Sequence, residues 1–219
     1  MSGQIALVIT CGDWLNLREE IRKAEIVNAD YLHMDVMDGT FVPNYMGGTD
    51  IIKAVHSETS IKQDIHLMVN DPENKLHYFN LRENDFISFH LESSNYPEKV
   101  IELIHKSGCL AGISLSPERT VEELKSYINI IDYINVMCVK PGFAGQKILS
   151  GSKERIMEVR KLIDNSGRNI LLEVDGNVSF ENAVWMKEAG ADIFVLGSSS
   201  AYKKGNFIEN VSKIKTIVR

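Results

Sequence analysis

The chain has 219 residues, of which 44% are hydrophobic and 25% charged, and its formal net charge is −6. This composition predicts one globular domain over residues 1–219, and the negative charge argues against nucleic acid as a partner. The start lacks a signal-peptide pattern, no apolar run reaches membrane-spanning length, and the three cysteines form no CxxC pair, so we expect a cytoplasmic protein with no membrane partner.

Short apolar runs alternate with longer amphipathic segments along the whole chain. Eight strands are predicted near residues 5–10, 31–36, 62–66, 86–90, 111–115, 133–139, 170–175 and 193–197. Helices are predicted between and after them, near residues 14–27, 50–57, 72–81, 96–106, 121–127, 153–165, 180–188 and 206–218. Eight such units predict an α/β fold of the single-domain (β/α)8 TIM barrel type. A doubly wound open sheet would not easily explain polar residues at the ends of so many strands.

Four of those polar residues have the chemistry of a metal site. His33 and Asp35 lie at alternate positions near the end of one predicted strand, so their side chains share a face, and His66 and Asp175 end two other strands. In this fold the carboxyl ends of the strands meet at one rim. Any one of these residues alone would be read as part of the core or the rim. Together, two imidazoles and two carboxylates predict one divalent metal ion: zinc, manganese or iron(II), with cobalt as a further option.

Glycine-rich loops follow the last three predicted strands, at residues 141–146, 175–177 and 197–200. Each would be an ordinary turn by itself, but three at adjacent strand ends predict a phosphate site, because glycine lets backbone N–H groups approach an anion. Three methionines, Met37, Met68 and Met137, fall at or just past strand ends. Their spacing fits core filling and an apolar cover over a reaction centre equally well.

Several segments resemble the ribulose-phosphate 3-epimerase family, which includes allulose-6-phosphate 3-epimerases. They are residues 33–44 (HMDVMDGTFVPN), 65–69 (IHLMV), 88–92 (SFHLE), 136–146 (VMCVKPGFAGQ), 173–176 (EVDG) and 196–198 (LGS), so the resemblance covers nearly the whole chain. It implies a ribulose-phosphate-binding barrel of carbohydrate metabolism, acting in the pentose phosphate pathway as a homo-oligomer. The implied reaction is C3 epimerisation of the D-ribulose 5-phosphate to D-xylulose 5-phosphate type.

The resemblance also implies roles for individual residues. Asp35 and Asp175 would be acid and base on opposite faces of the substrate, while a metal on His33, Asp35, His66 and Asp175 stabilises the enediolate between them. Met37, Met68 and Met137 would cover the reacting carbons. The phosphate would be held by Gly142, Phe143, Ala144, Gly145, Gly176, Asn177, Gly197 and Ser198. Asp38 is expected to support the loop that follows it.

Departures from the family pattern leave the sugar open. Val8 stands where the family has a serine. Lys140 stands where the family usually has Asn or Asp, and Ser116 stands where it usually has Asn. A different ketose phosphate, such as D-allulose 6-phosphate, is therefore a second hypothesis, because loss of a hydrogen-bonding partner changes discrimination strongly. Lys140 either reaches solvent or contacts the substrate.

Two other functions compete with an epimerase. A phosphosugar lyase or decarboxylase would carry an Asp-x-Lys-x-x-Asp run on a strand, and the equivalent run here, residues 33–38 (HMDVMD), contains no lysine. A non-catalytic phosphosugar-binding protein would explain Val8 and Lys140, but it would not explain why both aspartates are retained.

Overall fold

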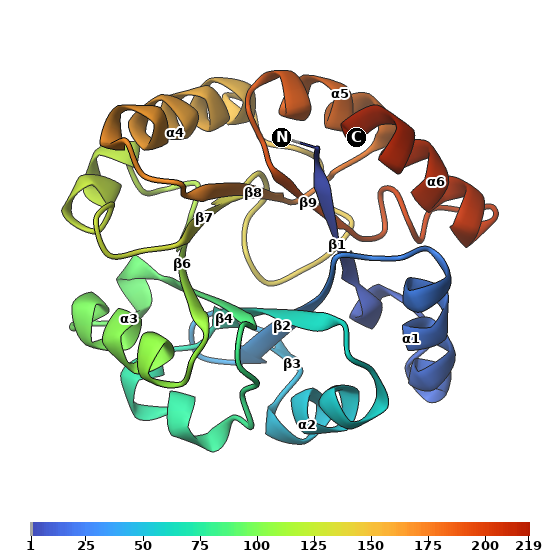
Figure 1. The fold of residues 1–219 in the computed structure, drawn as a ribbon, viewed down its shortest axis with the longest axis horizontal. Coiled ribbons are helices and arrows are strands. Elements are labelled where there is room, and N and C mark those ends of the chain that lie inside the picture. Colours follow the sequence, from blue (N-terminus) through green and yellow to red (C-terminus); the bar gives the residue numbers. More distant parts are fainter. Residues whose placement is uncertain (1) are drawn as a thin grey trace.

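A closed barrel of parallel strands surrounds the centre of the molecule in the computed structural model, which describes residues 2–219 (Figure 1). Eight strands of the described chain form it: β1 (Gln4–Val8), β2 (Tyr31–Asp38), β4 (Lys62–Met68), β5 (Phe86–His90), β6 (Leu110–Leu115), β7 (Tyr133–Met137), β8 (Leu171–Asp175) and β9 (Ile193–Leu196). Each pairs in parallel with the next, and β1 pairs with both β2 and β9, which closes the ring. The predicted (β/α)8 TIM barrel is confirmed.

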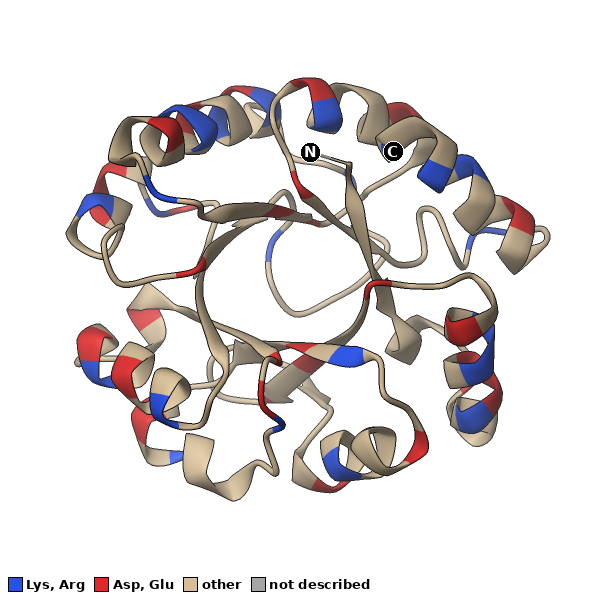
Figure 2. Ribbon diagram, viewed as in Figure 1, with Lys and Arg blue, Asp and Glu red and all other residues tan. Residues whose placement is uncertain are grey.

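Helices form the outer ring of the barrel. They are α1 (Leu17–Ile26), α2 (Thr49–Glu58), α3 (Pro97–Lys106), α4 (Ser152–Ser166), α5 (Phe180–Glu188) and α6 (Phe207–Val218). Figure 2 shows that most lysines and arginines lie on these outer helices, and that the two chain ends lie near one another. In residues 2–219, no helix has both the length and the apolar character needed to cross a bilayer.

Two predicted helices are wrong in type. The segment 72–81 forms two short 3₁₀ turns, Pro72–Asn74 and Leu76–Tyr78, and 121–127 forms the 3₁₀ helix Val121–Ser126. The start signals are real, since Thr120 and Glu123 form a capping box. A cap fixes where a helical turn begins, but so short a segment gains few hydrogen bonds for the entropy it loses.

Smaller differences affect the first strands. The predicted helix 14–27 opens with a 3₁₀ turn before α1, and β1 stops at Val8, where another 3₁₀ turn begins. Sequence patterns also missed the short strand β3 (Tyr45–Met46), which pairs antiparallel with Met37 and Asp38 and folds the chain back over the rim.

Asp38 supports this loop as expected. Its Oδ1 accepts hydrogen bonds from the backbone N–H groups of Thr40 and Phe41, both at 2.9 Å. Its Oδ2 accepts from the backbone N–H of Asn70 at 2.9 Å and from Lys75 Nζ at 2.8 Å. The carboxylate therefore joins the loops that follow β2 and β4 and stays out of the central cluster of side chains.

The barrel interior is layered. Its lower layer is apolar and comprises Ala6, Tyr31, Phe86, Tyr133 and Ile193, with Val8 and Val195 at its upper edge. Tyr133 fits because Gly112 faces it: a Cβ at Gly112 would stand 2.3 Å from the tyrosine ring. Above lies a buried polar layer of His33, Asp64, Ser88, Ser114, Asn135 and Glu173. Because side chains alternate along each strand, this polar layer supports the residues of the rim directly above it.

Candidate active site

Four side chains converge at the carboxyl end of the barrel. His33 and Asp35 come from β2, His66 from β4, and Asp175 from β8, which faces β2 across the barrel (Figure 1). Asp35 Oδ1 lies 3.2 Å from His66 Nδ1 and 3.4 Å from His33 Nε2. Asp175 Oδ2 lies 3.6 Å from His66 Nδ1 and 3.8 Å from His33 Nε2. The structure thus brings together all four residues that the sequence singled out.

The chemistry of this cluster fits a divalent cation. One ligand atom from each residue lies within 4.8 Å of all the others. His33 Nδ1 contacts Asp64 Oδ2 at 2.5 Å, whereas His33 Nε2 is buried and has no hydrogen-bond partner among residues 2–219. A buried, unpaired imidazole nitrogen aimed at two carboxylates is costly by itself, and a cation with mixed nitrogen and oxygen ligands would satisfy it.

The two carboxylates have different proton affinities. Burial raises the pKa of both groups, but the nearby imidazoles of His33 and His66 outweigh it at Asp35 and hold that pKa well below its ordinary value. At Asp175 burial prevails, with the negative charge of Asp35 adding to it, and the pKa is raised. Environments that displace the pKa values of two carboxyl groups in opposite directions suit one group to act as an acid and the other as a base.

The charge on His33 follows from its neighbours. Burial alone would lower its pKa, but the carboxylates of Asp64 and Asp35 hold that pKa well above its ordinary value. Without a cation, a proton on His33 would therefore supply the positive charge that the cluster needs.

Behind His66 a line of hydrogen bonds runs outward. His66 Nε2 lies 2.8 Å from His90 Nε2, and His90 Nδ1 lies 2.7 Å from Ser116 Oγ. The hydroxyl of Ser116 donates in turn to Glu92 Oε1. Burial holds the pKa of His90 well below its ordinary value, so that ring is neutral. The sequence placed His90 and Ser116 at strand ends but assigned them no role.

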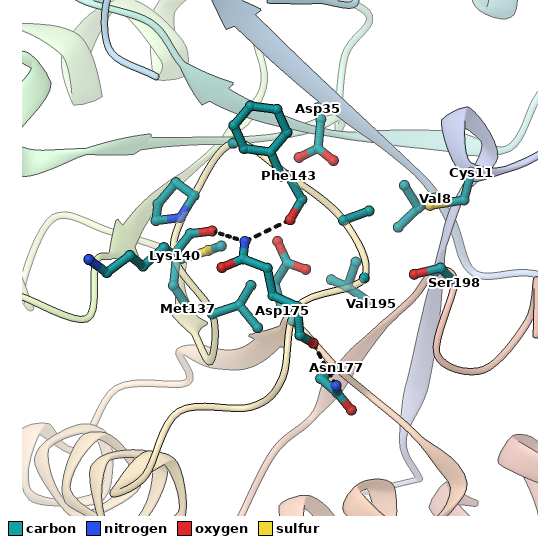
Figure 3. Close-up of a pocket in the computed structure, with 18 of the residues that line it drawn as sticks. Val8, Cys11, Asp35, Met137, Lys140, Phe143, Asp175, Asn177, Val195 and Ser198 are labelled. Atoms are coloured by element: carbon teal, nitrogen blue, oxygen red, sulfur yellow. Dashed lines mark hydrogen bonds between the residues drawn. The ribbon is translucent and has the colours of Figure 1, made fainter. Parts of the chain in front are cut away.

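A cavity of about 280 Å³ opens above the four-residue cluster (Figure 3). The eight predicted phosphate residues, the three methionines, Asp35 and Asp175 all line it. Two side chains fix the loop after β7: Gln146 donates to the carbonyls of Lys140 and Phe143, and Asn177 donates to the carbonyl of Gln146, each at 2.7 Å. Gly142 and Gly145 have positive φ angles of 115° and 79°, so glycine gives this loop its shape.

The methionines lie on the wall of this cavity. Met37, Met68 and Met137 are each at least 93% buried, and Met37 and Met68 pack against Val42. This placement favours an apolar cover over core filling. Met46, from the missed strand β3, also lines the cavity; its apolar side chain beside the loop 39–44 was the signal that sequence reasoning passed over.

Lys140 lies at the edge of the cavity. Its side chain is 70% exposed, its ammonium lies 3.9 Å from Glu118, and Figure 3 shows it extending away from Asp35 and Asp175. Other residues complete the wall: Thr10, Cys11, Val139, Pro141, Gln146, Val195 and Ser199. Burial raises the pKa of Cys11 to about 11, so this thiol is a poor nucleophile at neutral pH.

The fold and this cluster define a TIM-barrel enzyme whose acidic and imidazole side chains converge beneath a glycine-rich pocket. Comparison with known proteins identifies its family. Residues 4–200 match the model of the ribulose-phosphate 3 epimerase family, and the chain belongs to that family. It is therefore an isomerase of the epimerase kind.

Named relatives are similar over most of their length. A ribulose-phosphate 3-epimerase of Buchnera aphidicola subsp. Schizaphis graminum is 38% identical over 89% of this chain and 86% of the relative. One from Bacillus subtilis is 35% identical over 97% of this chain and 98% of the relative. A solved orotidine 5'-phosphate decarboxylase from Pyrococcus horikoshii is similar in fold alone, with a TM-score of 0.67 and 16% identity over 99% of both chains.

Proposed function

We propose that the chain interconverts D-ribulose 5-phosphate and D-xylulose 5-phosphate by epimerisation at C3, with Asp35 and Asp175 as base and acid. One observation carries the proposal: these two carboxylates come from opposite sides of the barrel and meet beneath one cavity. A carbon held between them has one group able to accept a proton and, on its other face, one able to donate.

The proton transfers balance in either direction. The ionised carboxylate of Asp35 takes the C3 proton, leaving the substrate as an enediolate, and the carboxyl group of Asp175 returns a proton to the opposite face. The reverse reaction exchanges the two roles. Met37, Met68 and Met137 would exclude water from the carbanion-like carbon, since buried methionines offer it no proton.

The residues that would hold a metal are His33 through Nε2, His66 through Nδ1, Asp35 and Asp175. When bound, one divalent cation such as zinc, manganese or iron(II) supplies positive charge beside the substrate's oxygens, which stabilises the charge left after proton removal. The two histidines are buried behind the carboxylates, so their role is to hold and orient.

The phosphate would lie against the loops after β7, β8 and β9. These are the loops of Gly142 to Gly145, of Gly176 and Asn177, and of Gly197 and Ser198. Barrels of this type commonly place phosphate after the last two strands. A homo-oligomer, which the family resemblance implies, and a cytoplasmic location, which the sequence itself led us to expect, are further proposals that sedimentation and cell fractionation would test.

A second substrate, D-allulose 6-phosphate, is favoured by Val8. This apolar side chain lines the cavity at the end of β1, where a hydroxyl would otherwise hydrogen-bond the sugar. Weaker binding of D-ribulose 5-phosphate would leave the longer D-allulose 6-phosphate as the better substrate. A non-catalytic phosphosugar-binding protein is the remaining alternative.

A panel of ketopentose and ketohexose phosphates, incubated with zinc-, manganese- or iron(II)-loaded protein in D2O, tests the proposal. We expect exchange at C3 with at least D-ribulose 5-phosphate, and a loss of about 10² to 10⁴-fold in Asp175→Asn. Asp164→Asn, which alters an exposed aspartate on α4, is the matched control and should retain full activity. Exchange with none of these sugars would favour the binding protein, and full activity in Asp175→Asn would reject the two-carboxylate mechanism.

A further inference from the structure

Along the line of hydrogen bonds behind His66, each residue donates to the next in one fixed order. We propose that His90, Ser116 and Glu92 are positioning residues that fix the tautomer of His66, so that its Nδ1 lone pair faces Asp35 and Asp175. This inference rests on the proposed function, because a lone pair at that point serves a metal ligand.

The contact between the two histidines allows two arrangements. His66 Nε2 and His90 Nε2 are 2.8 Å apart, so one hydrogen atom must lie between them. If His66 donates it, neutral His66 keeps Nδ1 unprotonated towards the carboxylates. If His90 donates it, the proton of neutral His66 lies on Nδ1, where it would block a metal.

Glu92 decides between these arrangements. Its carboxylate has no proton to give, so the Ser116 hydroxyl must donate to Glu92 Oε1. With its hydrogen committed, Ser116 Oγ can only accept from His90, whose Nδ1 lies 2.7 Å away. Neutral His90 then has its single N–H on Nδ1, and its Nε2 must accept from His66. Each step leaves the next residue one choice.

Burial makes the arrangement persistent. His66 and His90 are fully buried and Ser116 is 3% exposed, so solvent has little access to supply a competing donor or acceptor. The ring of Phe41 lies over His90, with ring centroids 4.8 Å apart. Glu92 alone of the four is partly exposed, at 28% for its side chain, and Arg119 Nε lies 4.0 Å from its Oε2. In a low-dielectric interior, reversing one hydrogen bond would leave a buried polar group unpaired.

Two variants remove the fixed order of donors and acceptors along this line of hydrogen bonds while leaving His66 in place. Ser116→Ala deletes the link, and Glu92→Gln replaces the obligate acceptor with an amide of the same shape that can also donate. Ser93→Ala is the matched control, because the hydroxyl of this buried serine donates to the backbone carbonyl of the same His90 and takes no part in the line.

The experiment has two readouts. The first is the 15N NMR tautomer of His90 and His66 in metal-free protein, where the wild type and Ser93→Ala should show His90 protonated on Nδ1. The second is the zinc dissociation constant measured by chelator competition, which we expect to weaken about tenfold or more in Ser116→Ala and Glu92→Gln and to stay unchanged in Ser93→Ala.

Each outcome has a definite meaning. A wild-type His90 protonated on Nε2, or zinc affinity in both variants equal to that of the wild type, overturns the inference while the proposed epimerase stands. Wild-type protein that binds no zinc, manganese or iron(II) overturns the metal site itself, and with it the purpose of the lone pair. Altered tautomers with weakened zinc binding in the two variants alone support it.

Discussion

The two sides of the barrel build the site in different ways. On the side of β2 and β4, the site consists of side chains held by other side chains: His33 by Asp64, and His66 by His90. On the side of β7, β8 and β9, it consists largely of backbone, shaped by glycines at positive φ and by amide side chains that bind loop carbonyls. Asp175 belongs to the second side by sequence but lies among the histidines of the first.

This difference separates two tasks. A cation needs a few donor atoms at fixed positions, which hydrogen-bonded histidines supply, whereas a phosphate is bound well by several backbone N–H groups. Changes on the first side should therefore alter metal affinity, and changes on the second should alter the Michaelis constant for the phosphosugar.

The largest expected effect on this separation comes from Asp64→Asn. Asp64 is buried and holds His33 Nδ1 at 2.5 Å, so an amide in its place would release the orientation of His33. We expect the zinc dissociation constant to rise about 100-fold, the upper end for residues that support a ligand. Asp85→Asn is the control, since this buried aspartate pairs with His56 at the other end of the barrel. Equal loss of zinc affinity in both variants would mean a general effect on folding.

A smaller effect is expected on the phosphate side from Gly142→Ala. Gly142 has φ of 115°, and an added Cβ would stand 3.1 Å from Val42 Cβ, so the loop must shift. Strain on the order of 1–2 kcal/mol corresponds to a rise of roughly tenfold in KM, with zinc affinity unchanged. Gly151→Ala carries similar backbone strain, at φ of 83°, outside the cavity and should leave KM alone. An unchanged KM in Gly142→Ala would remove this loop from phosphate binding.

The smallest effect is expected from Lys140→Met. The ammonium is exposed and its nearest carboxylate, Glu118, is 3.9 Å away, so its removal should change kcat and KM by less than about fivefold. Steady-state kinetics with D-ribulose 5-phosphate measure both constants. A much larger rise in KM would instead assign Lys140 to the substrate, and the phosphate side would then use a side-chain charge as well as backbone.

The sequence predicted these two sides unequally. His33, Asp35, His66 and Asp175 could be grouped because parallel strands of a barrel end at one rim, so strand position alone brings them together. The line from His66 to Glu92 could not be predicted, since it depends on side-chain rotamers and on which ring nitrogen meets which neighbour. Strand β3 was missed because two residues carry too little periodicity to indicate a strand. The 3₁₀ segments were predicted as full helices because a cap marks where a helix starts and does not fix its length.

The origin of the hydrogen at C3 of the product tests the central claim most directly. The wild-type enzyme, loaded with metal, would convert unlabelled D-ribulose 5-phosphate in D2O, and the D-xylulose 5-phosphate formed at early conversion would be isolated. Two carboxylates on opposite faces predict deuterium at C3 in this product, because the donated proton comes from a group that exchanges with solvent. Product that retains the original hydrogen would contradict the account, since one group would then have removed and returned it.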